Sequence, residues 1–396
     1  MKTTLFVLLL LLPTGIKAQG DHKALIADSD SLRSIISRLF PDVKKNFSSR
    51  MNLEFSTAAT ASFSSNDVTQ AEFNVNRVRL EILGKFSQRF EYHFRQSFNK
   101  YSNPHAVDNL SSSVEYANVS WITSPRFKLT MGKQFMMLGG YEYLSSGLKV
   151  REFTEFNNKI QQLQAGLGGE FSFSPNHILL LQVLNSRAGR DKDTYIYGLP
   201  IGSQSAKAPL TTVINWNGFF ANKSINLLYG IGSGELAKSA GILYLTAGHK
   251  YEKGPIIAYF DLMYSREGID SKGMLSEMTS TWETPQTLKN VEYLTAIADF
   301  DYRIHPKWNV FVKGAYETGR IFKANCGLDP GLYRVGWNAQ ASVEFYPMSN
   351  SELKVYLHLL YKGYHLTELS RKFSPGFYLH NTQRISIGFV YKIPVF

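Results

Sequence analysis

Residues 76–98 read NRVRLEILGKFSQRFEYHFRQSF, and two runs of alternating side chains lie within them. A period of two is the period of a β-strand, and two such runs joined by the polar residues 87–89 predict a β-hairpin. One face of this hairpin is apolar and rich in aromatic rings, whereas the other carries mostly charged groups. The apolar face holds Val78, Leu80, Ile82, Phe86, Phe90, Tyr92, Phe94 and Phe98, and the other face holds Arg79, Glu81, Leu83, Lys85, Glu91, His93, Arg95 and Ser97.

The first twenty residues, MKTTLFVLLLLLPTGIKAQG, predict a secretory signal peptide. A basic residue precedes an apolar run from Leu5 to Leu12, and cleavage is expected after Ala18. About eight apolar residues are too few to cross a ~30 Å hydrocarbon layer, so a membrane anchor is the weaker interpretation. We therefore expect residues 1–18 to be a signal peptide and the protein to be exported.

Composition narrows the class of protein further. The chain holds 22 Tyr and 27 Phe but one Cys, Cys326, which excludes a small secreted fold held together by disulfides. The formal net charge of +11 fits three kinds of partner, namely nucleic acid, an anionic membrane surface and anionic solutes. Because the protein is expected to be exported, we expect no nucleic-acid partner.

Residues 19–48 are expected to form a periplasmic N-terminal segment with a short helix. Leu32, Ile35, Ile36 and Leu39 follow helical spacing, and Pro41 ends the pattern. This helix would either pack against the rest of the fold or contact another subunit.

Residues 49–396 contain sixteen alternating segments, whose lengths suit strands that cross a bilayer at a tilt. Tight polar turns at every second connection alternate with connections that are mostly long. The turns are 87–89, 123–126, 174–176, 221–224, 252–255, 304–307 and 347–351, and the long connections include 102–113, 136–158, 186–210, 266–290, 319–332 and 365–381. All tight turns must then lie at one edge of the sheet, which is typical of outer-membrane barrels and has no cause in a soluble sandwich.

We therefore predict an all-β fold, a 16-stranded antiparallel transmembrane β-barrel with a short N-terminal periplasmic helix, in the bacterial outer membrane. The apolar face would contact outer-membrane lipid, and the charged face would line a water-filled lumen. The terminal Phe396 resembles the aromatic end that the barrel-assembly machinery reads. If Phe396 also faces lipid, Pro394 shifts the alternation by one residue, which predicts a bulge in the last strand.

Two stretches resemble the phosphate-selective porin O and P family. They are residues 76–94 and residues 126–156, RFKLTMGKQFMMLGGYEYLSSGLKVREFTEF, with a G-x-Q-F element at Gly132, Gln134 and Phe135. The resemblance implies that loop 3, Met136 to Asn158, folds into the barrel and narrows it. It also implies that inward basic residues guide small anions such as phosphate, and that the protein is a homotrimer.

The charged face supplies the candidate site residues. The anion-guiding lumen residues are expected to be Arg77, Arg79, Lys85, Arg95, Lys128, Lys313, Lys354, Lys362 and Arg384, against the inward acids Glu81, Glu91, Glu317 and Glu344. A positive pore attracts anions, whereas the alternative is that these charges pair with their neighbours and select nothing. Lys149 and Arg151 are the candidate constriction residues of loop 3, which would otherwise be a surface loop that covers the mouth.

Signatures of enzymes and cofactors are absent from the sequence. The nine His residues have no metal-ligand spacing, and GIGSGE at 230–235 lacks the Lys of a phosphate loop, so its glycines are expected to allow close packing. A lipase embedded in the barrel, using the inward His93 or His358, is the enzymatic alternative. We predict a porin for passive diffusion of small solutes that favours anions, with no cofactor and no metal. The alternatives are a general non-selective porin and a closed barrel whose external loops bind a partner, as in an adhesin or receptor.

Overall fold

The computed structural model of the chain describes residues 48–64, 67–100, 107–145, 152–348 and 352–395, which belong to one compact unit. The signal peptide, the N-terminal helix and Phe396 lie outside the described residues. In the described ranges, no helix is both long enough and apolar enough to cross a membrane.

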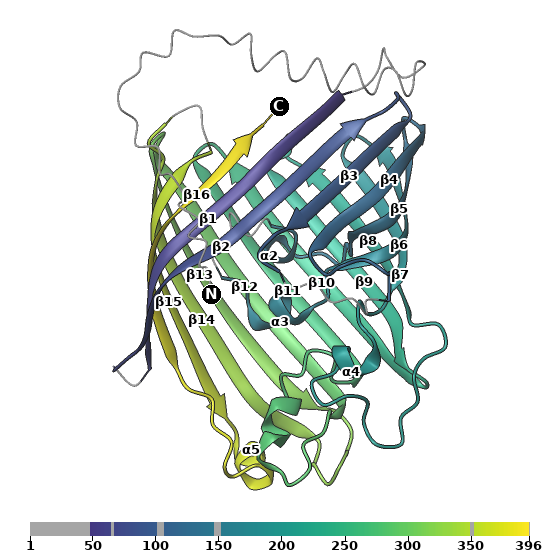
Figure 1. Cartoon of the computed structure of the whole chain (residues 1–396), viewed down its shortest axis with the longest axis vertical. Helices are drawn as coiled ribbons and strands as arrows, with labels where there is room; N and C mark the ends of the chain where they lie inside the picture. The colour runs from purple at the N-terminus through teal and green to yellow at the C-terminus, as the bar shows by residue number, and fades with distance from the viewer. Residues whose placement is uncertain (1–47, 65–66, 101–106, 146–151, 349–351, 396) are drawn as a thin grey trace, which may run out of the picture. The chain divides into compact units, whose positions relative to one another are not determined.

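The described residues form sixteen antiparallel strands that run around a closed barrel (Figure 1). The first eight are β1 (Ser48–Ser64), β2 (Asp67–Lys85), β3 (Phe90–Ser97), β4 (Val114–Ser124), β5 (Phe127–Phe135), β6 (Leu163–Ser174), β7 (His177–Asn185) and β8 (Leu210–Phe220). The others are β9 (Ile225–Ala237), β10 (Ala240–Lys253), β11 (Ile256–Ile269), β12 (Lys289–His305), β13 (Trp308–Ile321), β14 (Gly331–Phe345), β15 (Lys354–Leu366) and β16 (Thr382–Pro394).

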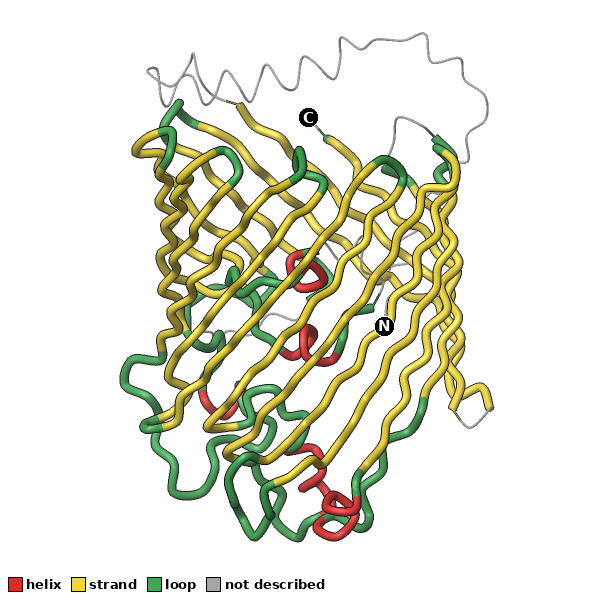
Figure 2. The backbone as a smooth tube through the Cα atoms, turned by 180° about the vertical axis from the view of Figure 1, so that it is seen from behind, coloured by secondary structure: helices red, strands yellow, loops and turns green. Residues whose placement is uncertain are grey.

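Short helices occur only in the connections of this described barrel. They are α2 (Tyr141–Leu144), α3 (Glu155–Lys159), α4 (Asp191–Thr194), η2 (Ser276–Thr281) and α5 (Glu368–Phe373). Helices α2 and α3 lie inside the barrel, between its walls, as the helical turns at mid-height in Figure 2 show. The predicted barrel of sixteen strands is therefore confirmed, and one of its loops occupies the interior.

Each strand pairs with its neighbours in sequence, and β1 pairs with β16 to close the sheet. The register between β1 and β16 runs without a shift from Phe63 opposite Gln383 to Asn52 opposite Pro394. The amide of Val395 continues the same register by donating to Met51 O at 2.8 Å. The expected bulge near Pro394 is therefore wrong, because Pro394 stands at the end of the last strand and interrupts no ladder.

The two faces of the hairpin that starts at residue 76 point as the alternation predicts. Ile82 stands opposite Phe94 on the outer face, and Glu81 stands opposite Arg95 on the inner face. Aromatic rings pack along the outer face near the tight-turn edge, where Phe86 and Phe90 stack with ring centroids 5.6 Å apart. Apolar side chains stay exposed around the outside of the barrel, which is the surface that a bilayer would cover.

Six of the seven predicted tight turns lie wholly within the described residues and occur at one edge of the barrel, where the seventh, 347–351, falls between β14 and β15. The six predicted long connections join strands at the other edge (Figure 1). Two further connections at the long-loop edge are tight as well. Residues 65–66 join β1 to β2, and residues 238–239 join β9 to β10. The strands of both hairpins are long, with 17 and 19 residues in β1 and β2 and 13 and 14 residues in β9 and β10.

Candidate functional site in the barrel lumen

The described residues of loop 3, 136–145 and 152–158, lie in the interior of the barrel between β5 and β6. Gly139 and Gly140 have φ angles of 115° and 88°, a conformation that residues with a Cβ rarely adopt. On the facing wall, a Cβ at Gly230 would lie 1.6 Å from the carbonyl oxygen of Leu138. The hydroxyl of Thr246 donates to the same carbonyl at 2.5 Å. The glycines at 230–235 therefore serve close packing, as the sequence indicated.

Apolar side chains of loop 3 bury themselves against inward residues of the wall. Leu138, Tyr143 and Phe156 are fully buried or nearly so, in one cluster with Tyr244 and Met263. Each such side chain contributes about 1.5–3 kcal/mol on burial. On this side, the barrel is filled by a packed core.

Glu142 of α2 is the first polar anchor of loop 3. Its carboxylate receives a hydrogen bond from Lys313 Nζ of β13 at 2.6 Å, and from Thr154 Oγ1 at 2.7 Å. The amide of Glu142 donates to Asp261 of β11 at 2.8 Å. Lys313 is almost completely buried, so its ammonium faces a carboxylate under the loop and has no contact with open water.

Glu152 is the second anchor, on the far side of the lumen. It forms salt bridges of 2.6 Å with Lys362 of β15 and with Arg384 of β16. Burial by itself would raise the pKa of Glu152, but the two cations outweigh this effect and lower it. Three carboxylates of loop 3 thus hold bases of the wall, because Glu155 also pairs with Arg334 of β14.

The connection between β11 and β12 holds loop 3 from the long-loop side. The ammonium of Lys272 is fully buried, pairs with Glu267, and lies 4.5 Å from the ring centroid of Phe156. Tyr244 and Tyr293 complete an aromatic cage at 4.8 Å and 5.4 Å. Burial lowers the pKa of Lys272, while the nearby Glu267 opposes that shift. A cation held between aromatic faces is stabilised by their quadrupoles.

The wall made by β2 and β3 carries a second network of charges, away from these anchors of loop 3. Arg79 lies 3.2 Å from Glu54 and 2.9 Å from Glu115, and Arg95 lies 2.8 Å from Glu115. Among the described residues, five cations share three carboxylates in this network. The cations are Arg77, Arg79, Arg95, Lys100 and Lys392, and the carboxylates are Glu54, Glu81 and Glu115.

All nine predicted lumen bases lie on the inner face, and each has a carboxylate within 4 Å. The partners are Glu54 for Arg77, Glu54 and Glu115 for Arg79, Glu91 for Lys85, Glu81 and Glu115 for Arg95, Glu170 for Lys128, Glu142 for Lys313, Glu344 for Lys354, and Glu152 for Lys362 and Arg384. The nearest carboxylate of Arg77 lies at 3.8 Å, whereas each of the other eight bases has one within 3.3 Å. Lys149 and Arg151 lie outside the described residues.

Sequence reasoning missed most of the acidic partners. Glu54 alternates with Leu53 and Phe55, so the same period of two could have placed it in the lumen. Glu115 turns inward because the register shifts between Arg95 and Gln96, and nothing in the sequence marks that shift.

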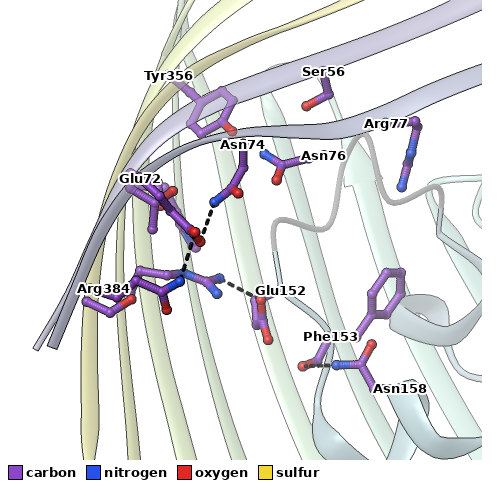
Figure 3. Close-up of a pocket in the computed structure, with 15 residues that line it drawn as sticks. Ser56, Glu72, Asn74, Asn76, Arg77, Glu152, Phe153, Asn158, Tyr356 and Arg384 are labelled. Carbon is purple, nitrogen blue, oxygen red and sulfur yellow. Dashed lines mark hydrogen bonds and ion pairs between the residues drawn. The ribbon is translucent and has the colours of Figure 1, made fainter. Parts of the chain in front are cut away.

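A cavity of about 400 Å³ lies between loop 3 and the wall formed by β1, β2, β15 and β16 (Figure 3). Glu152 and Phe153 line it from the loop, and Arg77, Asn74 and Arg384 line it from the wall. A second cavity, of about 660 Å³, lies between β1–β7 and the start of loop 3, and His93, Tyr116 and Lys128 are among the residues that line it. The lumen is thus narrowed by loop 3 but keeps water-accessible space on the side that the loop leaves uncovered.

Several solved structures share this fold at low sequence identity. The outer-membrane channel DcaP of Acinetobacter baumannii has a TM-score of 0.62 and 8% identity, covering 88% of this chain and 98% of that one. An anion-selective porin from Comamonas acidovorans has a TM-score of 0.54 and 7% identity, covering 88% and 100%. OmpT of Vibrio cholerae has a TM-score of 0.54 and 10% identity, covering 88% and 98%. No curated protein matches the chain in sequence.

The family described as phosphate-selective porin O and P matches residues 48–393, which is nearly the whole barrel. The sixteen-stranded barrel with a loop folded into its lumen agrees with that match. The chain therefore belongs to the phosphate-selective porin O and P family and is a porin, a non-enzymatic channel, of the bacterial outer membrane.

Proposed function

We propose that this porin favours small anions, and that they pass through the cavity between loop 3 and the wall of β1, β2, β15 and β16. The observation that carries the proposal is Arg77. Its guanidinium lines the cavity, and its nearest carboxylate is farther away than that of any other of the nine lumen bases. Its Nη1 atom is buried and has no hydrogen-bond partner among the described residues, so no close acceptor neutralises this end of the guanidinium. The charge of Arg77 is therefore less neutralised than that of the other bases, and it attracts a solute anion into the cavity that the residue lines.

The neighbouring charges support the same preference. The network on the β2–β3 wall holds more cations than carboxylates, and Glu152 is shared by two cations. Such an excess makes the local potential positive and raises the concentration of anions near the constriction. The family name and the printed title of the Comamonas porin agree with an anionic solute, and phosphate is the first to test.

The second candidate is a general, weakly selective porin. It is favoured by the finding that every one of the nine predicted bases has a carboxylate within 4 Å. Paired charges attract solute ions less than isolated charges do, since their fields partly cancel. The two candidates differ in the reversal potential across a salt gradient.

The assembly that we propose follows the sequence. A signal peptide, residues 1–18, directs export, a periplasmic segment, residues 19–48, carries a short helix, and the barrel assembles as a homotrimer. An aromatic Phe396 after the last strand is suited to recognition by the barrel-assembly machinery.

Reversal potentials test the proposal. The full chain is reconstituted in a planar bilayer, and the reversal potential is measured across a tenfold KCl gradient. We expect chloride to be favoured, and Arg77→Glu to shift the potential toward potassium. The matched control is Lys223→Glu, in the exposed turn between β8 and β9, which should leave the potential unchanged. A native channel that favours potassium would overturn the anion preference and leave the porin fold intact.

A further inference from the structure

Uncharged polar side chains, more than charged ones, line the open wall of the 400 Å³ cavity. They form a row along the inner faces of β1, β2 and β16, and include Ser56, Thr60, Ser62, Asn74, Asn76 and Ser386. Register puts these strands side by side, with Thr60 opposite Ser386 and Ala58 opposite Asn74. The row therefore offers hydroxyl and amide groups along a continuous stretch of the pore.

Much of this row has unused hydrogen-bonding capacity. Within the described part of the chain, the hydroxyls of Ser56 and Ser62 and the side-chain amide of Asn76 have no protein partner. The hydroxyls of Thr60 and Ser386 lie 3.2 Å apart, and either can donate. Each hydroxyl can both donate and accept, and each amide presents an acceptor beside its donors.

This mixture of donors and acceptors does not match a bare inorganic anion. A fully ionised anion needs donors, and acceptor oxygens beside it are repulsive. Glu72 adds a carboxylate to the same wall, where Gln70 and Asn74 amides donate to it at 2.8 Å. Hydroxyl groups of a solute, by contrast, can donate to Glu72 and to the amide oxygens, and can accept from the remaining donors.

The cavity is also large enough for one small solute with hydroxyl groups, and two cations line it. Its volume of about 400 Å³ lies within the ~300–1,000 Å³ range of small-molecule sites. Arg77 lies on the wall beside Asn76, and Arg384 of the wall pairs with Glu152 of loop 3 (Figure 3). Phe153 and Tyr356 supply aromatic surfaces against which the C–H groups of a sugar can pack.

We propose that this cavity is a binding site for an anionic polyol, a solute with several hydroxyl groups and one acidic group. The acidic group lies near Arg77, and the hydroxyl groups lie along the row of β1, β2 and β16. The proposal deepens and rests on the proposed anion preference, because it names the class of solute that this same cavity selects.

Block of the KCl current by added solutes tests the site. The probes are gluconate, inorganic phosphate and glucose, applied to the full chain in a planar bilayer. Gluconate should reach half-block at a concentration about tenfold lower than either phosphate or glucose, because it alone makes both the ionic contact and the hydroxyl contacts.

Two kinds of variant separate the contributions. Thr60→Val with Ser62→Ala should weaken the gluconate block about tenfold while leaving the reversal potential in KCl unchanged. Arg77→Gln should weaken block by gluconate and by phosphate alike. The matched control is Thr318→Val, on the outer face of β13 opposite Leu294, which should change neither block nor reversal potential.

Failure of this site is distinguishable from failure of the anion preference. Gluconate that blocks no better than phosphate, or a block that ignores the loss of the Thr60 and Ser62 hydroxyls, would overturn the polyol site. Equal block by glucose and gluconate would overturn its anionic part. Potassium preference in a channel that still shows a hydroxyl-dependent gluconate block would contradict the general anion preference and support the polyol site.

Discussion

The interior of the barrel has two sides that are built from the same kind of strand but differ in the polarity and burial of their inward side chains. We define the loop-covered side as the inner faces of β8–β14 and the open side as those of β16, β1, β2 and β3. On the loop-covered side, Tyr244 and Met263 are buried beneath loop 3. At corresponding inward positions of the open side, Thr60 and Asn74 line a cavity.

The comparison shows that one barrel can contain a packed hydrophobic core against some of its strands and a water-filled cavity against others. Strands of the open side alternate cleanly between apolar and polar residues, since one face meets lipid and the other meets water. Residues 242–245 of β10 read ILYL, apolar at every position. A strand buried on both faces has this composition, and the second apolar face is the seat of loop 3.

The largest expected effect comes from placing the same charge on each side. Met263→Arg buries an unpaired guanidinium under loop 3 and should lower the free energy of unfolding by on the order of 4 kcal/mol. Thr60→Arg places the group in the cavity and should cost about 0.5 kcal/mol or less. Equilibrium unfolding by denaturant in lipid vesicles measures both, and equal losses would remove the distinction between the two sides.

The next effect concerns the seat of loop 3 on β9. Gly230→Val should displace the loop at a cost of about 1–3 kcal/mol, because its side chain meets the Leu138 carbonyl. The single-channel conductance should then increase. Gly314→Val is the matched control, since Gly314 of β13 has no atom within 4 Å of an added Cβ. Unchanged conductance in Gly230→Val would mean that the loop does not limit the channel.

The third effect concerns Glu152, which joins loop 3 to the edge of the open side. Its folded-state pKa is lowered from 4.5, so its contribution to stability is present above the unfolded pKa and is lost as the pH falls through the folded value. At pH 7 Glu152→Gln should cost about 1–3 kcal/mol. The difference between native protein and variant should persist to pH 4.5 and disappear only under more acidic conditions.

The exposed pair of Asp329 and Lys372, 3.3 Å apart, provides the control for that measurement. Asp329→Asn should change stability by less than about 1 kcal/mol, because water and salt screen the pair. An equal loss of stability in both variants would show that the salt bridges of Glu152 in the lumen stabilise the fold no more than an exposed pair does.

The smallest effect is on ion selectivity, and it belongs to the open side. Raising KCl from ~0.1 M to ~1 M shortens the Debye length from ~10 Å to ~3 Å, so the chloride preference should fade. Arg77→Gln should reduce the preference at the lower salt concentration. Lys354→Gln, at a buried ammonium paired with Glu344, should shift the reversal potential less. A larger shift from Lys354→Gln would place the selecting charge elsewhere.

The sequence predicts the barrel well because alternation and turn chemistry are local signals. The tight turn at 221–224 shows this, since Ala221, Asn222 and Lys223 take left-handed φ angles in a stretch that composition alone marks as a turn. The bulge predicted near Pro394 was wrong, because the register between β1 and β16 shows no shift there. The ladder with β1 continues past Pro394 to Val395.

The candidate site was predicted only in part, because its partners come from distant segments. Alternation placed Lys362 and Arg384 on the inner face, but their shared partner Glu152 is more than two hundred residues away. Only the folded path of loop 3 brings that carboxylate to them. The apolar second face of β10 was the available signal for where the loop would lie.

The seam between β1 and β16 has a consequence for biogenesis. Its partners, such as Thr60 and Ser386, are separated by 326 residues, so closing the seam is a contact of very long range. Until β16 pairs, both β1 and β15 present unpaired backbone groups, which hydrocarbon does not tolerate. The nascent chain must therefore be kept as an unclosed intermediate until the final strand is available. Insertion into the bilayer and closure of the barrel therefore occur together, late in assembly. A chain that lacks β16 could not form a stable barrel in the bilayer, because its strand edges would stay unpaired.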